Sequence, residues 1–126
     1  MNPIEKIQFE KEYKSSPKAW TDIHAGGLFF CVPYEEIVKF HKGGKVEITK
    51  RVIENFRPCW GQRQIDKINN FKLIGTYKLS GREYVECTFE GLSMIGLPLE
   101  INYNIIAFHC SGFKDSQYGT TYKLSN

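Results

Sequence analysis

The stretch FKLIGTYKLSGREYVECTF, residues 71–89, is the clearest indication of the fold class. Before the turn at Ser80–Gly81, one face is shared by Phe71, Leu73, Gly75, Tyr77 and Leu79. After the turn, an apolar face carries Val85, Cys87 and Phe89, and the opposite face carries Tyr84, Glu86, Thr88 and Glu90. Apolar residues at every second position predict half-buried antiparallel strands, so the stretch is predicted to form a β-hairpin. Ile74 is an apolar exception on the polar face of the first strand.

Other stretches repeat this alternation or form a short apolar run bounded by turn residues. They are residues 26–33, 34–42, 45–52, 99–108 and 120–124. With the hairpin they predict about seven strands in simple succession. Such a chain is mainly β, and its antiparallel meander is predicted to form a small closed or half-open barrel. Gly43–Gly44 marks a second hairpin turn, and Pro33 is predicted to end or bend its strand.

Three segments are predicted to lie outside the strands. Residues 3–15 predict an N-terminal helix, because Pro3 suits a first turn and Ile4 and Ile7 begin an apolar side. Residues 53–70 lose the period of two and predict a loop with short helical turns, and residues 109–119 predict a long turn. A single domain is expected over residues 1–126, with the helix and a connector in 1–25 and the β-meander barrel in 26–124.

The composition excludes several classes of protein. Hydrophobic residues make up 41% and charged residues 25% of the chain, as in ordinary globular domains rather than disordered chains. The net charge is +3, but the cations, Lys50 among them, are interleaved with acids and are read as solvated surface, which argues against nucleic-acid binding. The charged first residues differ from a secretory signal, and no apolar run is long enough to span a membrane. A cytoplasmic protein is therefore expected.

The cysteines and histidines predict no metal site and no cofactor. The cysteines stand at positions 31, 59, 87 and 110 without a CxxC pair, whereas zinc sites bring their ligands in close pairs. Disulfides are not expected without a secretory signal. Cys59, in the loop RPCWG, is the candidate for an exposed reactive thiol, and an enzyme hypothesis would rest on it. Since no nucleophile and base support each other, a non-catalytic protein is the first expectation.

Aromatic residues supply the candidate ligand-binding site. In the expected register, one interior is faced by Phe40, Tyr77, Phe89 and Tyr103, and Trp60 in a loop is placed over the opening. A buried tyrosine hydroxyl needs a hydrogen-bond partner, so two inward tyrosines suggest a barrel mouth or a polar contact for a ligand. The alternative is that these rings form a packed core and that Trp60 closes the barrel's end.

The order of these features resembles small bacterial lipocalin-like domains over about residues 26–124. The resemblance is carried by the glycine hairpin between Phe40 and Val46, the irregular middle segment, the G-x-Y-x-L-S-G run from Gly75 to Gly81, and a final aromatic strand. The Gly-x-Trp motif of true lipocalins is absent around Trp20. The resemblance implies a barrel or half-barrel that holds a small apolar ligand or serves as a scaffold.

Two functional hypotheses follow. The first is a non-catalytic binding protein with a small apolar ligand inside the barrel, at the aromatic site. The second is a protein-interaction module that uses an exposed sheet edge or sheet face to bind a partner or a second copy of the chain. The apolar strand at 27–33 is the candidate edge.

Overall fold

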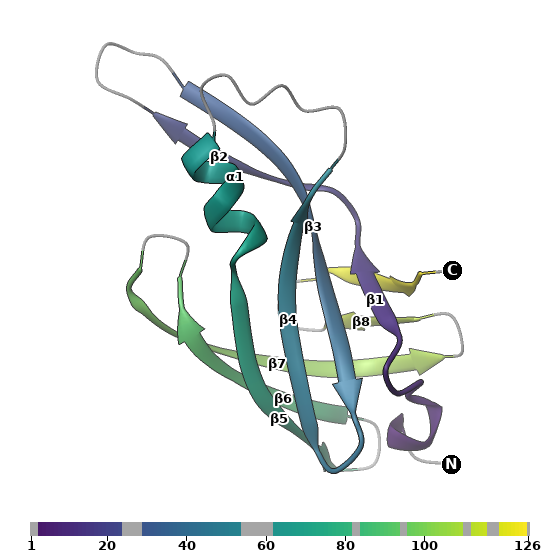
Figure 1. Ribbon diagram of the computed structural model, residues 1–126. Coiled ribbons are helices and arrows are strands. Elements are labelled where there is room, and N and C mark those ends of the chain that lie inside the picture. The colour runs from purple at the N-terminus through teal and green to yellow at the C-terminus, as the bar shows by residue number, and fades with distance from the viewer. Residues whose placement is uncertain are drawn as a thin grey trace.

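The computed structural model describes residues 3–23, 29–53, 62–81, 84–93, 96–109, 112–115 and 119–125. This part of the chain forms one antiparallel sheet of nine strands, one α-helix and one 3-10 helix (Figure 1). The helices are η1 (Pro3–Lys6) and α1 (Gln62–Asn69). The strands are β1 (Glu12–Ser15), β2 (Lys18–Ile23), β3 (Phe29–His41), β4 (Lys45–Val52), β5 (Lys72–Ser80), β6 (Tyr84–Leu92), β7 (Pro98–His109), β8 (Gly112–Asp115) and β9 (Thr121–Leu124).

The strands follow one another as an antiparallel meander from β2 and β3 through to β9. β1 pairs with β9 on one side and with β3 on the other, so eight strands, β1 and β3–β9, curl into a barrel-like sheet. β2 pairs with the first half of β3, and the two extend beyond the rest of the sheet (Figure 1). The predicted fold class is thus confirmed.

The predicted N-terminal helix over residues 3–15 is wrong. Only one 3-10 turn forms at Pro3–Lys6, and β1 begins at Glu12. Tyr13 and Ser15 alternate into the interior, and β1 hydrogen-bonds two strands at once, which outweighs the weak helical preference of a short segment. The sheet therefore spans Glu12 to Leu124, rather than beginning at residue 26 after a helix and connector.

Two strand boundaries also differ from expectation. The predicted strands 26–33 and 34–42 form the single strand β3, which runs through Pro33. The Pro33 carbonyl accepts a hydrogen bond from the Ile53 amide, 3.0 Å away. The N–H group that Pro33 lacks would face the same side of the strand, just past the end of β4. The pairing of β3 with β2 therefore loses no hydrogen bond at Pro33. The predicted turn at 109–119 contains β8, whereas the helical turn expected in the middle segment is confirmed by α1.

The interior is filled by side chains from nearly every strand. The largest fully buried side chains are Tyr13, Phe40, Phe89, Phe113 and Tyr122. Several of these rings contact one another: the Phe113 and Tyr122 centroids are 4.7 Å apart and stacked, and the Phe40 and Phe113 centroids are 5.8 Å apart and edge-on. A smaller cluster lies where α1 packs on β3 and β4, with Ile68 and Tyr34 at its centre.

Gly75 is required where β5 passes between β4 and β6. A Cβ atom at this position would lie 1.9 Å from the backbone oxygen of Thr88 in β6, a contact that only movement of the backbone could relieve. We expect Gly75→Ala to lower the free energy of unfolding by about 1–3 kcal/mol or more, measured by urea denaturation. Lys78→Ala, at an exposed position of the same strand, is the control and should change it by less than about 0.5 kcal/mol. Equal effects would contradict the close approach.

Candidate functional site

Three of the five predicted ligand-binding residues come together in the core. The Phe40 and Tyr77 ring centroids lie 5.3 Å apart in an edge-on contact, and Phe89 is buried in the same cluster. The Tyr77 hydroxyl donates to the backbone oxygen of His41 at 2.8 Å, which satisfies it without a ligand. Trp60 and the Tyr103 side chain lie outside the residues and side chains that the structure describes.

The contacts of Phe40, Tyr77 and Phe89 match the packed-core alternative. Three surface hollows are lined by described residues, and none of the three aromatic residues lines them. Among the described residues, two other features stand out, one on the outer face of the sheet and one at the end of the barrel beside α1.

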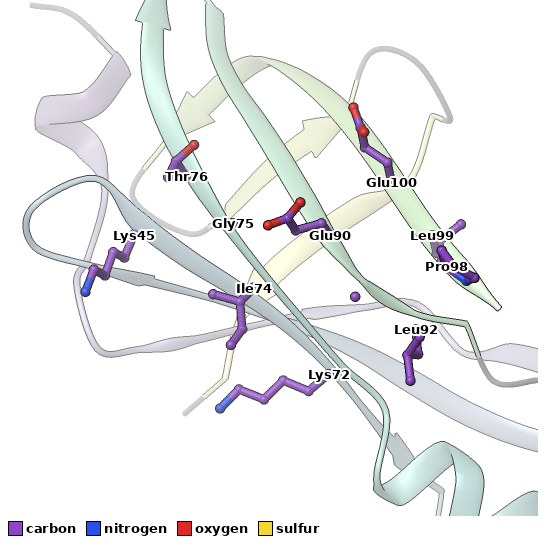
Figure 2. A pocket seen from close by; sticks show the side chains of 11 residues that line it. Lys45, Lys72, Ile74, Gly75, Thr76, Glu90, Leu92, Pro98, Leu99 and Glu100 are labelled. Carbon is purple, nitrogen blue, oxygen red and sulfur yellow. The ribbon is translucent and has the colours of Figure 1, made fainter. Parts of the chain in front are cut away.

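The outer face of β5, β6 and β7 carries an open hollow of about 920 Å³, here called the outer hollow (Figure 2). Its lining residues come from the four strands β4 to β7: Lys45, Lys72, Ile74, Gly75, Thr76, Glu90, Gly91, Leu92, Pro98, Leu99 and Glu100. Ile74 and Leu92 are 57% and 59% exposed, although both are large apolar side chains. The sequence signal for this surface is Ile74, the apolar residue on a polar face.

Charges of opposite sign flank the apolar part of the outer hollow. Figure 2 shows Ile74 between Lys45 and Lys72 on one side and Glu90 on the other. Glu90 and Glu100 are direct partners across β6 and β7, an arrangement in which like charges repel. Lys72 binds Glu47 at 3.1 Å instead, and among the described residues no cation lies within ion-pair distance of Glu90 or Glu100.

A polar cluster occupies the end of the barrel near α1. Glu36 is only 5% exposed, because the inward register of β3 places it between Tyr34 and Val38. Its carboxylate accepts from the Lys18 ammonium at 3.0 Å and from the Tyr122 hydroxyl at 3.1 Å. The Glu36 amide donates to the Ser15 hydroxyl at 3.0 Å. Glu36 is therefore hydrogen-bonded to three strands at once, through its carboxylate to β2 and β9 and through its amide to β1.

Lys50 lies directly across from Glu36 in the pairing of β3 with β4. Its Nζ atom is 4.1 Å from the centroid of the Phe71 ring and 4.9 Å from that of Tyr34. Burial lowers the pKa of Lys50 and the Lys18 ammonium lowers it further, whereas the Glu36 carboxylate opposes both. The interpretation of Lys50 as solvated surface is wrong, since it continues the inward positions Val46 and Ile48.

The remaining candidate residues are placed as follows. Cys87 is fully buried, and burial raises the pKa of its thiol, so it is not a reactive thiolate; Cys59 lies outside the described residues. The described residues contain no group of three or more potential metal ligands. The prediction that residues 27–33 form an exposed sheet edge is wrong for the described residues 29–33. These residues pair with β2, and β2 is the last strand in the order of the sheet.

Comparison of the chain with protein-family models, with curated protein sequences and with solved structures found no match. Within the described ranges, no helix has the length and apolar character that crossing a membrane requires. A function must therefore be argued from the chemistry of the outer hollow and of the polar cluster formed by Glu36, Lys18 and Lys50.

Proposed function

We propose that the protein is a non-catalytic binding protein that docks an extended segment of a partner protein in the outer hollow. The observation that supports this proposal is the exposure of Ile74 and Leu92 beside Pro98 and Leu99. Large apolar side chains scattered singly are ordinary on a protein surface, but a group of them in one hollow is typical of an interaction site. An open hollow that runs across several strands suits an extended chain better than a compact small molecule.

The charges select the partner's chemistry. The apolar floor favours a segment with aliphatic or aromatic side chains, and the opposed Glu90 and Glu100 favour a lysine or arginine among them. A cation between the two carboxylates would offset their mutual repulsion and add a charge-assisted hydrogen bond. The proposed occupant is therefore a basic and apolar peptide segment, and electrostatic complementarity of this kind adds specificity.

A selection from a displayed peptide library, with the intact protein as bait, tests this proposal. We expect the selected peptides to combine apolar residues with lysine or arginine. Ile74→Asp should weaken their binding at least about tenfold, since it removes an apolar contact worth about 1.5–3 kcal/mol. Glu90→Lys should weaken it as well. The matched control is Leu79→Asp, an exposed leucine of the same strand that does not line the outer hollow.

Three outcomes would contradict the proposal. Peptides that bind Ile74→Asp as well as the unchanged protein would place the interaction elsewhere. Enrichment of acidic peptides would reverse the expected charge. A dimer seen by light scattering that Ile74→Asp dissociates would make a second copy of the chain the occupant instead of a peptide.

A further inference from the structure

We propose that Lys50 binds the anionic group of a small organic carboxylate with a flat apolar part, at the end of the barrel beside α1. This Lys50 site is independent of the outer hollow, because it faces the interior of the sheet. It also differs from the aromatic site expected from the sequence, since Phe40 and Phe89 are not part of it.

The first support is the position of the ammonium. Lys50 lies between two apolar clusters: Phe71 belongs to the main core, and Tyr34 belongs to the cluster under α1. The ring faces contact the ammonium and stabilise its charge, but they accept no conventional hydrogen bond. An ammonium has three N–H donors, so donors remain for a ligand that approaches from outside the two rings.

The second support is the balance of charge. Lys18 and Lys50 both face the single carboxylate of Glu36 on the described strands, and Lys18 Nζ, at 3.0 Å, is the one in ion-pair contact with it. Among the described residues, no oxygen acceptor lies within hydrogen-bond or ion-pair distance of Lys50 Nζ. A partly buried cation without an acceptor is costly, and a bound anion would offset that cost.

The third support is access combined with a flat apolar surface. Lys50 keeps part of its side chain exposed to solvent, so a ligand can reach it. Tyr34 and Phe71 are 8% and 7% exposed and leave only a narrow apolar margin beside the ammonium. A planar aromatic carboxylate can place its ring against apolar side chains while its oxygens accept from Lys50. A cationic or neutral molecule of the same shape gains no such bond.

Titration of the intact protein with 1-naphthoate, followed by NMR and calorimetry, tests the inference. We expect saturable binding that shifts the ring proton signals of Tyr34 and Phe71. Naphthalene-1-methanol, which has the same ring without the carboxylate, should bind at least about tenfold more weakly. Lys50→Met should reduce naphthoate binding by a similar factor. The matched control Lys78→Met removes an exposed lysine of β5 that does not line the outer hollow, and it should change nothing.

The inference is overturned if naphthoate leaves the Tyr34 and Phe71 signals unmoved at saturation or fails to saturate. Equal affinity for naphthoate and naphthalene-1-methanol would also overturn it, since the ligand carboxylate would then contribute nothing to binding. If Lys50→Met does not fold, the ligand comparison on the unchanged protein decides the question alone. Naphthoate binding that Ile74→Asp abolishes, and Lys50→Met does not, would assign the ligand to the outer hollow.

Discussion

Phe40→Ala will lower the free energy of unfolding by about 3–5 kcal/mol, a large part of the whole stability of a domain this size. The Phe40 ring is fully buried and makes edge-on contacts with Tyr13 and Tyr77 at centroid distances of 5.8 and 5.3 Å. Truncation removes these contacts and leaves a cavity in the middle of the sheet. Urea denaturation monitored by far-UV circular dichroism measures the loss.

Tyr84→Ala is the control for this prediction, because Tyr84 is an aromatic residue of a strand but is 44% exposed. Its loss should cost no more than about 1 kcal/mol. A cost below about 1 kcal/mol for Phe40→Ala would mean that the interior tolerates an empty space there. The aromatic ligand site expected from Phe40, Tyr77 and Phe89 would then regain support over a packed core.

Glu36→Ala will lower the free energy of unfolding by about 3–5 kcal/mol, because it breaks a buried, hydrogen-bonded charge cluster by removing one partner. Lys18 would lose its carboxylate and the Tyr122 hydroxyl its acceptor. Lys50 would lose the Glu36 carboxylate, which raises its pKa, and its charge would then lie between Tyr34 and Phe71 without that compensation. Thermal and urea unfolding of the variant measure the effect.

Glu35→Ala provides the matched control for Glu36→Ala. Glu35 is the neighbouring residue, faces outward, and pairs with Lys14 only at 3.9 Å, so its removal should cost no more than about 1 kcal/mol. In the double variant Glu36→Ala/Lys50→Met, part of the lost stability should return, because the uncompensated ammonium is gone. Simple additivity of the two substitutions would contradict electrostatic coupling between Glu36 and Lys50.

The same cluster connects the stability prediction for Glu36 to the proposed Lys50 site. Lys50→Met alone keeps a long apolar side chain against Tyr34 and Phe71 while it removes a partly buried charge. Natural proteins keep such charges at sites where binding requires them, even when an apolar residue would be more stable. The variant that loses ligand is therefore not expected to lose stability comparably, which separates a binding role of Lys50 from a structural one.

Period-two alternation fixed which residues share a face in the hairpins. It correctly grouped Val85, Cys87 and Phe89 on one face of β6, all of them buried. It also marked Ile74 as an apolar residue on the polar face of β5, and Ile74 lines the outer hollow. These features were predictable because side chains of neighbouring strand residues point to opposite sides whatever the rest of the chain does.

Alternation did not decide which strands exist at the chain ends or what an inward charge would contact. Residues 12–15 become β1 only because β3 and β9, distant in sequence, offer backbone partners on both sides. Lys50 shares the inward register with Val46 and Ile48, yet a lysine in that pattern reads as surface until Glu36, Tyr34 and Phe71 are placed around it. The local sequence thus determined the faces of the strands, whereas the tertiary structure decided the closure of the sheet and the charge cluster, because both depend on contacts between residues far apart in the chain.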